Sequence, residues 1–177
     1  PGAPDLVGGG RAVWDDGASL VAMDLETGAE IRRLSDGRRL QRGLMTTDGE
    51  VICGVAVLAA GAFNAVLACL AMSDGRELFR DDTGTFLSTG GETGRLTDLE
   101  IAGGVLYARA LDQLFAYDIA SRGRLFTART QREWRGFVRV GDDLVTMSVA
   151  PCEPGPGGGC ILAVDPRTGT ARASRTV

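Results

Sequence analysis

The sequence contains no histidine and no lysine, so its 19 basic residues are all arginine. Without His, the chain has no imidazole base, no Ser-His-Asp arrangement and no imidazole metal ligand. Without Lys, it has no Schiff-base nucleophile and no phosphate-binding loop lysine. These absences exclude most common catalytic designs for this chain alone. We predict that the chain is not an enzyme and that it has no catalytic residue, no cofactor and no metal site.

The composition otherwise fits a globular protein with many turns. The chain has 177 residues, of which 26 are Gly and 24% are charged, so one folded domain is expected. A net charge of −4 gives no reason to expect nucleic acid or an anionic membrane as partner. The first residue is Pro1 rather than Met, and we expect a processed product or a fragment, with any signal peptide or anchor outside this segment.

The longest stretch without a charge, residues 51–72, has two interpretations. Its length is that of a transmembrane helix, but Ala and Gly are frequent in it and contribute little to transfer into lipid. The alternative is a hairpin of two apolar β-strands. The rest of the chain decides between the two.

Four segments of the sequence end alike, each with an apolar alternating run and a polar turn that closes on Gly. They cover residues 20–28, 67–75, 114–123 and 160–169. Their closing glycines are 47, 48 and 46 residues apart, at Gly28, Gly75, Gly123 and Gly169. A period this regular over the whole chain indicates a repeat architecture. We expect each closing Gly to supply the positive φ of its turn.

Each repeat contains four short alternating runs separated by Gly, Asp, Asn and Pro, which is typical of antiparallel strands. We name these strands A to D. Radially repeated four-stranded units are propeller blades, so we predict an all-β propeller with blades near 1–35, 36–80, 81–129 and 130–177. The apolar stretch then supplies strands B and C of the second blade, and no transmembrane span is expected.

The strand C–turn motif A-x-D-x-x-T-G resembles the repeat of PQQ-like β-propellers. It is clearest in the first and fourth repeats, at Ala22, Asp24, Thr27, Gly28, Ala163, Asp165, Thr168 and Gly169. The second repeat has Ala71 in place of the Asp, and the third has one extra residue before Gly123. The resemblance implies a larger ring of seven or eight blades, of which this chain supplies four.

The same resemblance bears on activity, because the family includes quinone-dependent dehydrogenases. These place a Trp after the T-G turn and a vicinal Cys pair beneath the quinone. Here the corresponding positions hold Leu34, Phe79 or Arg80, and Ala128, and no two cysteines are adjacent. The resemblance therefore implies a non-catalytic member of the family.

The four cysteines form two pairs, each bracketing the B–C hairpin of a repeat. Cys53 and Cys69 lie almost symmetrically about Gly61, and Cys152 and Cys160 flank a Gly- and Pro-rich loop. We predict two disulfides and an oxidising, extracytoplasmic location, either periplasmic or extracellular. The alternative is reduced cysteines packed as small hydrophobes, whereas zinc without His needs all four to converge.

In each antiparallel blade the B–C hairpin and the D–A connection lie at one end, and the A–B and C–D turns lie at the other. The irregular segments fall at the B–C end, including apolar residues 58–64 and two arginine clusters. Exposed apolar patches rimmed by Arg are typical of interfaces. We therefore predict a protein contact at Leu58, Phe63, Arg39 and Arg135. The alternative for the arginines is a solvated polar edge.

Pairs of adjacent aspartates also occur in the sequence, and we interpret them as turn residues.

Three functional hypotheses remain. The first is a non-catalytic scaffold or interaction module outside the cytoplasm, as a subunit of a larger membrane-associated assembly. The second is the ligand-sensing ectodomain of a bacterial signalling receptor such as a kinase. The third is a fragment of a quinoprotein dehydrogenase.

Overall fold

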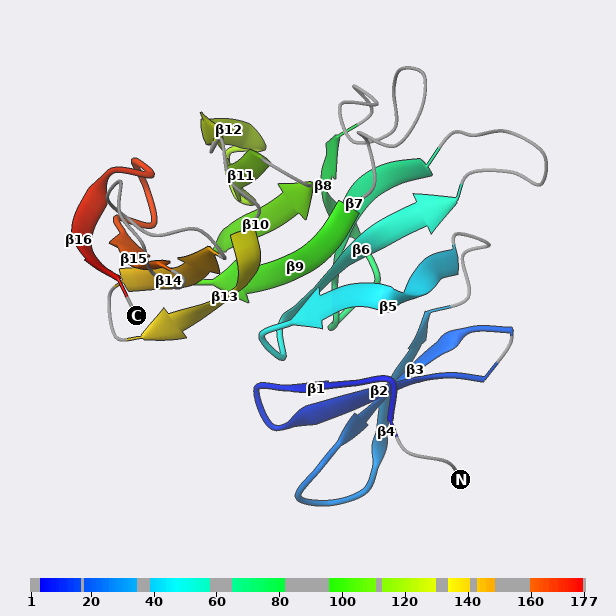
Figure 1. The fold of residues 1–177 in the computed structure, drawn as a ribbon. Helices are drawn as coiled ribbons and strands as arrows, with labels where there is room; N and C mark the ends of the chain where they lie inside the picture. Colours follow the sequence, from blue (N-terminus) through cyan, green and yellow to red (C-terminus); the bar gives the residue numbers. More distant parts are fainter. Residues whose placement is uncertain are drawn as a thin grey trace. The chain divides into compact units, whose positions relative to one another are not determined.

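The described part of the chain consists of β-strands joined by tight turns. The computed structural model describes residues 4–16, 18–34, 39–57, 65–81, 96–110, 113–129, 134–140, 143–148 and 160–176. Within these ranges every regular element is a strand, and the strands form four antiparallel sheets (Figure 1). The predicted architecture of four four-stranded blades is confirmed.

Each sheet takes its four strands from consecutive sequence, in the order A to D. Blade 1 contains β1 (Leu6–Gly8), β2 (Arg11–Asp15), β3 (Leu20–Asp24) and β4 (Glu30–Leu34). Blade 2 contains β5 (Arg39–Thr47), β6 (Val51–Val57), β7 (Ala65–Ala71) and β8 (Glu77–Asp81). Blade 3 contains β9 (Leu96–Ala102), β10 (Val105–Ala110), β11 (Gln113–Asp118) and β12 (Gly123–Arg129). Blade 4 contains β13 (Trp134–Val140), β14 (Asp143–Ser148), β15 (Cys160–Val164) and β16 (Ala171–Thr176).

The blades group into two compact units, Pro1–Thr89 with blades 1 and 2 and Gly90–Val177 with blades 3 and 4. The sheets lie within the predicted blade boundaries except that β8 extends to Asp81, one residue beyond the predicted end at 80. That the whole chain forms a single domain stays a prediction.

The apolar stretch is a hairpin. Strands β6 and β7 pair antiparallel in continuous register from Val51–Ala71 to Val57–Ala65. Both faces of the hairpin are buried at its centre, which is why the sequence is apolar without interruption. Among the described residues there is no helix long and apolar enough to span a membrane.

Each unit has its own core, formed where its two blades pack face to face. In the first unit, Val13, Ala22 and Leu34 of blade 1 belong to one cluster with Ile52 and Leu70 of blade 2. In the second unit, the corresponding cluster joins Tyr107 and Ala116 of blade 3 to Val164 and Leu162 of blade 4. Alternation along each strand sends neighbouring residues to opposite faces, so one face of each blade enters these clusters.

The C–D turns show the same packing in both units. Gly75 in blade 2 lies so close to blade 1 that an added Cβ would be 2.9 Å from Leu34 Cδ2. Gly169 in blade 4 approaches Phe126 of blade 3 in the same way, with Cδ2 at 2.7 Å. A turn glycine of the second blade thus meets strand D of the first blade in each unit.

One feature of the predicted repeat is wrong. Gly28, Gly75 and Gly169 have positive φ, but in the third turn the left-handed residue is Arg122, with φ 60°, and Gly123 is the first residue of β12. The left-handed positions 28, 75, 122 and 169 are each 47 residues apart. The third repeat therefore has no extra residue in its turn, and its Gly stands one position after the place where a left-handed backbone favours glycine.

Candidate functional site

The motif aspartate of the C–D turn closes the turn on itself. The Asp24 carboxylate accepts hydrogen bonds from the backbone N–H of Glu26 (3.0 Å) and Thr27 (2.8 Å) and from the Thr27 hydroxyl (2.9 Å). Gly28 N–H donates to the Asp24 carbonyl at 2.9 Å. These are the bonds of an Asx turn. The motif A-x-D-x-x-T-G is therefore satisfied internally.

The equivalent aspartates behave alike. Asp165 accepts the N–H groups of Arg167 and Thr168, and Asp118 accepts that of Ser121. The N–H donor of Thr168 is the first cause that lowers the pKa of Asp165, to about 2. In blade 2 the aspartate is replaced by Ala71, yet Gly75 N–H still donates to the Ala71 carbonyl at 2.8 Å. The backbone turn thus persists without the carboxylate.

The A–B and C–D turns of a blade lie at one end and are joined by backbone hydrogen bonds. In three blades, the residue that follows the position of the motif aspartate donates its backbone N–H to the carbonyl of the residue before strand B. These bonds run from Leu25 to Gly10 (3.0 Å), from Met72 to Glu50 (2.8 Å) and from Ile119 to Gly104 (3.1 Å). This end also packs tightly between blades 1 and 2, since an added Cβ on Gly9 would be 1.9 Å from the Asp48 carbonyl oxygen. The A–B and C–D turns therefore lie at the same end of a blade, as predicted. Their backbone groups are engaged in hydrogen bonds and in packing between blades.

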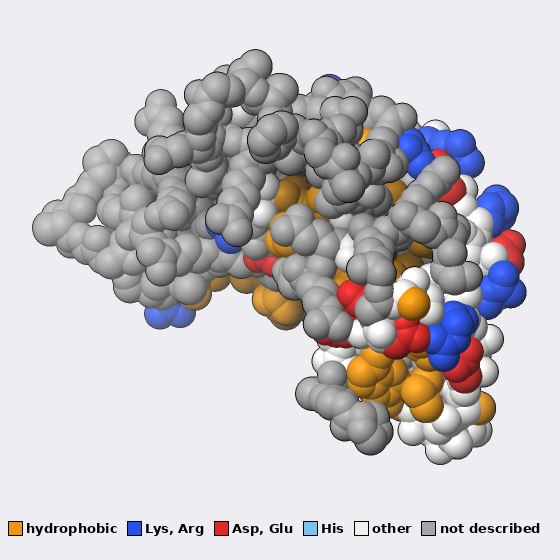
Figure 2. All heavy atoms as spheres, turned by 90° about the vertical axis from the view of Figure 1, so that its right-hand side faces the viewer, with side chains coloured by type: hydrophobic (Ala, Val, Ile, Leu, Met, Phe, Trp, Pro, Cys, Tyr) orange, Lys and Arg blue, Asp and Glu red, His pale blue; other side chains and the backbone are white. Residues whose placement is uncertain are grey.

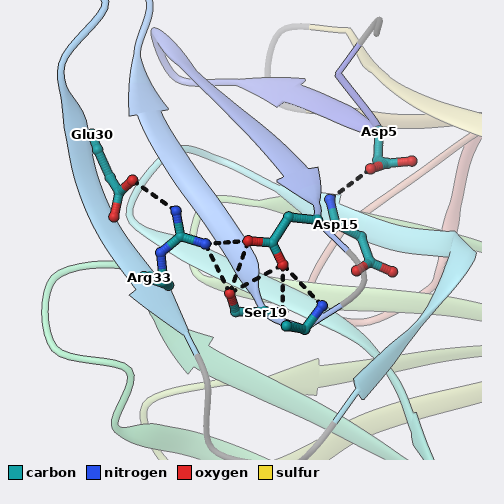
Figure 3. Close-up of polar contacts among 7 residues, drawn as sticks. Asp5, Asp15, Ser19, Glu30 and Arg33 are labelled. Atoms are coloured by element: carbon teal, nitrogen blue, oxygen red, sulfur yellow. Dashed lines mark hydrogen bonds and ion pairs between the residues drawn. The ribbon is translucent and has the colours of Figure 1, made fainter. Parts of the chain in front are cut away.

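At the B–C end of blade 1, a polar network holds the hairpin (Figure 3). The Asp16 carboxylate accepts the N–H groups of Ala18 (2.9 Å) and Ser19 (2.8 Å) and an ion pair from Arg33 of strand D. Arg33 also pairs with Glu30 at 3.0 Å. Beside this group, Asp5 accepts the N–H of Asp15 at 2.7 Å. Of the paired aspartates, Asp16 forms the turn, whereas Asp15 is the last residue of strand β2.

The network shifts the pKa values of its charged members. The backbone N–H groups of Ala18 and Ser19 lower the pKa of Asp16 to about 2, and Arg33 adds to the effect. Glu30 first and Asp16 second raise the pKa of Arg33. The group is exposed to solvent, so its energetic contribution is modest.

Charged side chains of strand D and of the C–D turn also make contacts within and between blades 1 and 2. Arg80 contacts Glu77 at 2.6 Å, Arg76 lies 3.7 Å from Asp74, and Arg32 donates to the Asp74 carbonyl at 3.1 Å. Figure 2 shows basic and acidic side chains interspersed along the described edge of the molecule. Arg32 and Arg33 of the first arginine cluster are thus engaged in intramolecular contacts, which supports a solvated polar edge at these two positions.

The predicted Cys53–Cys69 disulfide is present. The two residues are directly opposed in the register of β6 and β7, with Cα atoms 4.0 Å apart and both side chains fully buried. Cys160 is also disulfide-bonded. Its predicted partner, Cys152, lies outside the described residues.

The predicted contact residues are described only in part. Leu58 and Phe63 lie outside the described residues. The backbone of Arg39 pairs with Val57, which also belongs to the last pair of the β6–β7 hairpin, and that of Arg135 pairs with Met147, one residue before the end of β14. Each arginine position therefore lies at the B–C end of its own blade, while both side chains are outside the description.

A half-buried charged group in blade 3 was not predicted. Asp98 of strand β9 lies opposite Arg109 of strand β10, and Arg109 Nε is 3.9 Å from Asp98 Oδ2. Burial raises the pKa of Asp98 against the opposing effect of Arg109, and burial together with the charge of Asp98 raises the pKa of Glu100. Opposite Glu100, the Tyr107 hydroxyl donates to the Pro166 carbonyl of blade 4 at 2.7 Å. In the sequence, only the alternating carboxylates of residues 96–102 could have indicated this group, and the same pattern is typical of a strand with one face exposed to solvent.

The described residues contain no group of three or more His, Cys, Asp or Glu side chains that could hold a metal ion. The Asp98–Arg109 pair is a cross-strand contact between strands A and B of blade 3. Its chemistry is that of an ion pair beside a carboxyl group with a raised pKa.

Solved structures share this arrangement of sheets. BamB from Moraxella catarrhalis aligns over 96% of this chain with a TM-score of 0.52 and 13% identity. The fold is that of a β-propeller. A europium-containing methanol dehydrogenase aligns over 95% of the chain (TM-score 0.55, 14% identity), and KlAtg21 in complex with the coiled coil of AgAtg16 aligns over 98% (TM-score 0.62, 11% identity). Identity at this level carries the fold and no more.

The chain is short relative to these propellers. It spans 50% of the BamB chain, 40% of the dehydrogenase chain and 55% of the KlAtg21 chain. No protein-family model and no curated protein sequence matches it.

Proposed function

We propose that the chain is a non-catalytic, extracytoplasmic member of the PQQ-like propellers that binds a protein partner through its B–C end, within a membrane-associated assembly. The observation that carries this proposal is the contrast between the two ends of the blades. The A–B and C–D turns are closed by Asx bonds and by bonds between the turns. The B–C end carries the longest connections of the sequence, together with the predicted contact residues Leu58, Phe63, Arg39 and Arg135.

Two further observations support the proposal. One of the structurally similar propellers, KlAtg21, was solved with a coiled-coil partner, which is a protein-binding use of this fold. The buried disulfide between Cys53 and Cys69 fits an oxidising compartment, because cytosolic thiols are kept reduced.

Site-specific photo-crosslinking in cells tests the proposed binding end. A photo-reactive amino acid replaces Phe63 at the B–C end or, as a matched control, Leu25, which is 51% exposed in a C–D turn. We expect one recurrent protein adduct from position 63 and none of the same mass from position 25. The same adduct from both positions, or from position 25 alone, contradicts the assignment.

A further inference from the structure

The charge of the C–D turn and strand D differs between the two units. In blades 1 and 2 these segments cover residues 24–34 and 71–81, which contain four arginines and six carboxylates. The equivalent residues of blades 3 and 4, 118–128 and 165–175, contain five arginines and only two aspartates. The segments therefore carry a net negative charge in the first unit and a net positive charge in the second.

In blades 1 and 2 neighbouring carboxylates pair with the arginines of strand D. A glutamate at or near the start of the strand pairs with the arginine three residues later, Glu30 with Arg33 at 3.0 Å and Glu77 with Arg80 at 2.6 Å. In blade 3 the position of the glutamate holds Arg124, and a threonine stands in place of the arginine. Blade 3 thus has a positive charge where the first two blades have a negative one, and the ion pair is lost.

The arginines of blades 3 and 4 are exposed and mostly unpaired. Arg172 forms an ion pair with Asp165. The side chains of Arg122, Arg124 and Arg167 are exposed and make no hydrogen bond or ion pair with any residue that the structure describes. Within the described part of these two blades, every charged side chain that is exposed is an arginine. These guanidinium groups are available to an external anion.

The three unpaired arginines surround the C–D turn of blade 3. The C–D turn of blade 4 packs on strand D of blade 3, since an added Cβ on Gly169 would be 2.7 Å from Phe126 Cδ2. The N–H of Ser121 is the main cause that lowers the pKa of Asp118, and the charge of Arg167 adds to the effect. Arg167 of blade 4 therefore lies within electrostatic range of the blade 3 turn. Arg122 and Arg124 belong to that turn and to the start of the strand that follows it.

The backbone of Arg122 supports a role for its side chain. Its φ is 60°, whereas the equivalent turn positions of the other three blades all hold glycine. A left-handed backbone is unfavourable for a residue with a Cβ, so the conformation of the turn does not account for an arginine here. Backbone strain of this kind is common where a side chain binds a ligand.

From these observations we infer that the C–D turn of blade 3 binds an acidic segment of a protein through Arg122, Arg124 and Arg167. A guanidinium group donates two parallel hydrogen bonds to a carboxylate. Leu125 follows Arg124 and is 36% exposed, so it offers an apolar contact that a protein segment can use and a phosphate backbone cannot. The net charge of −4 on the whole chain also disfavours a long polyanion such as a nucleic acid. This surface lies at the opposite end of the blades from the proposed B–C contact.

Fluorescence anisotropy with the full chain, its disulfides intact, tests the inference first. The probe is a labelled peptide in which Glu alternates with Gly around one Leu, and the matched peptide has Gln in place of Glu. We expect the Glu peptide to bind, with an affinity that falls as salt is added, and the Gln peptide not to bind. Equal binding of the two peptides, or no binding of the Glu peptide at millimolar concentration, overturns the inference.

Paired substitutions then locate the site. The double variant Arg124→Gln with Arg167→Gln should bind the Glu peptide at least about tenfold more weakly than the wild type. The matched control, Arg32→Gln with Arg76→Gln, removes the same charge from arginines of the first unit that contact Asp74, and it should bind as the wild type does. Both variants should keep the wild-type circular dichroism spectrum. Equal loss in the control means attraction by net charge alone and contradicts the site.

Other anions test the class of partner. Vesicles of phosphatidylcholine with phosphatidylserine, and duplex DNA, are titrated at the same salt concentration. If either binds more tightly than the Glu peptide and depends on Arg124 and Arg167, the assignment to a protein segment is wrong.

The inference and the proposed function can fail separately. The double variant Leu58→Ser with Phe63→Ser should bind the Glu peptide as the wild type does, because its changes lie at the B–C end. The adduct from position 63 should persist in the Arg124→Gln, Arg167→Gln chain. Loss of peptide binding in the Leu58→Ser, Phe63→Ser chain contradicts a separate site at the blade 3 turn.

Discussion

Replacing Arg122 by Gly should stabilise the protein, although it removes a side chain. Arg122 is the one non-glycine residue with positive φ in the described part of the chain, and it is exposed in the C–D turn of blade 3. A left-handed backbone costs a residue with a Cβ about 1–2 kcal/mol. Glycine removes this cost but loses about 0.5–1 kcal/mol more conformational free energy on folding. The expected net gain is about 0.5–1 kcal/mol.

Thermal unfolding followed by circular dichroism measures the effect. A gain of this size should raise Tm by about 1–4 °C for a chain of this length. Arg124→Gly is the matched control, because Arg124 is exposed in strand β12 with an ordinary φ. That variant should lose about 0.5–1 kcal/mol.

The two arginine variants must therefore shift Tm in opposite directions. If Arg122→Gly lowers Tm as Arg124→Gly does, then position 122 is not left-handed. In that case the third turn contains an extra residue, and the period of 47 residues is wrong.

Three further predictions concern the turns and the charged groups. Gly169→Ala should destabilise the protein by about 1–3 kcal/mol, because φ is 70° and the added Cβ would lie 2.7 Å from Phe126. Gly28→Ala adds a Cβ that meets no atom within 4 Å, so it should cost less, and chemical denaturation of the two variants measures the difference. Asp165→Asn keeps an Asx acceptor but removes the charge, and since the pKa of Asp165 falls from 3.8 to about 2 on folding, the wild type should lose stability relative to the variant as pH falls from about 4 to about 2. Glu100→Gln should stabilise the protein at pH 7, because burial raises the pKa of Glu100 and disfavours its charged form. The gain in stability should vanish at acidic pH, where Glu100 is protonated, and a gain that does not depend on pH contradicts this cause.

The fold could be predicted from the sequence because each blade is built from local signals. Alternation of period 2 marks the strands, Gly-containing turns separate them, and the repeat supplies four independent copies of the same pattern. The apolar stretch at 51–72 resembles a membrane helix only when it is considered alone. Its neighbours in the repeat identify it as strands B and C.

The third turn was misassigned because its sequence carries Gly one position late. The residues SRG at 121–123 fit a turn that closes on Gly123 as readily as one that places Arg122 in the left-handed region. The energetic difference is about 1 kcal/mol, which the packing of strands β11 and β12 overcomes. The local conformational preference of a residue is too weak to decide between two turns that differ by one residue.

The charged group of blade 3 was missed for a tertiary reason. In strand β9, Leu99 and Ile101 alternate with Asp98 and Glu100, which is the pattern of a strand with one solvent-facing side. Packing of blade 3 against blade 4 leaves those carboxylates half-buried instead. The burial of a polar face depends on which sheet covers it, and a single strand carries no information about that.

The affinity of the crosslinked partner, measured by titration calorimetry with purified proteins, tests the central claim most directly. The double variant Leu58→Ser with Phe63→Ser should bind at least about tenfold more weakly than the wild type, with an unchanged circular dichroism spectrum. Leu25→Ser, at the opposite end of blade 1, should bind as the wild type does. Unchanged affinity in the double variant, or an equal loss in Leu25→Ser, would contradict a protein-binding surface at the B–C end.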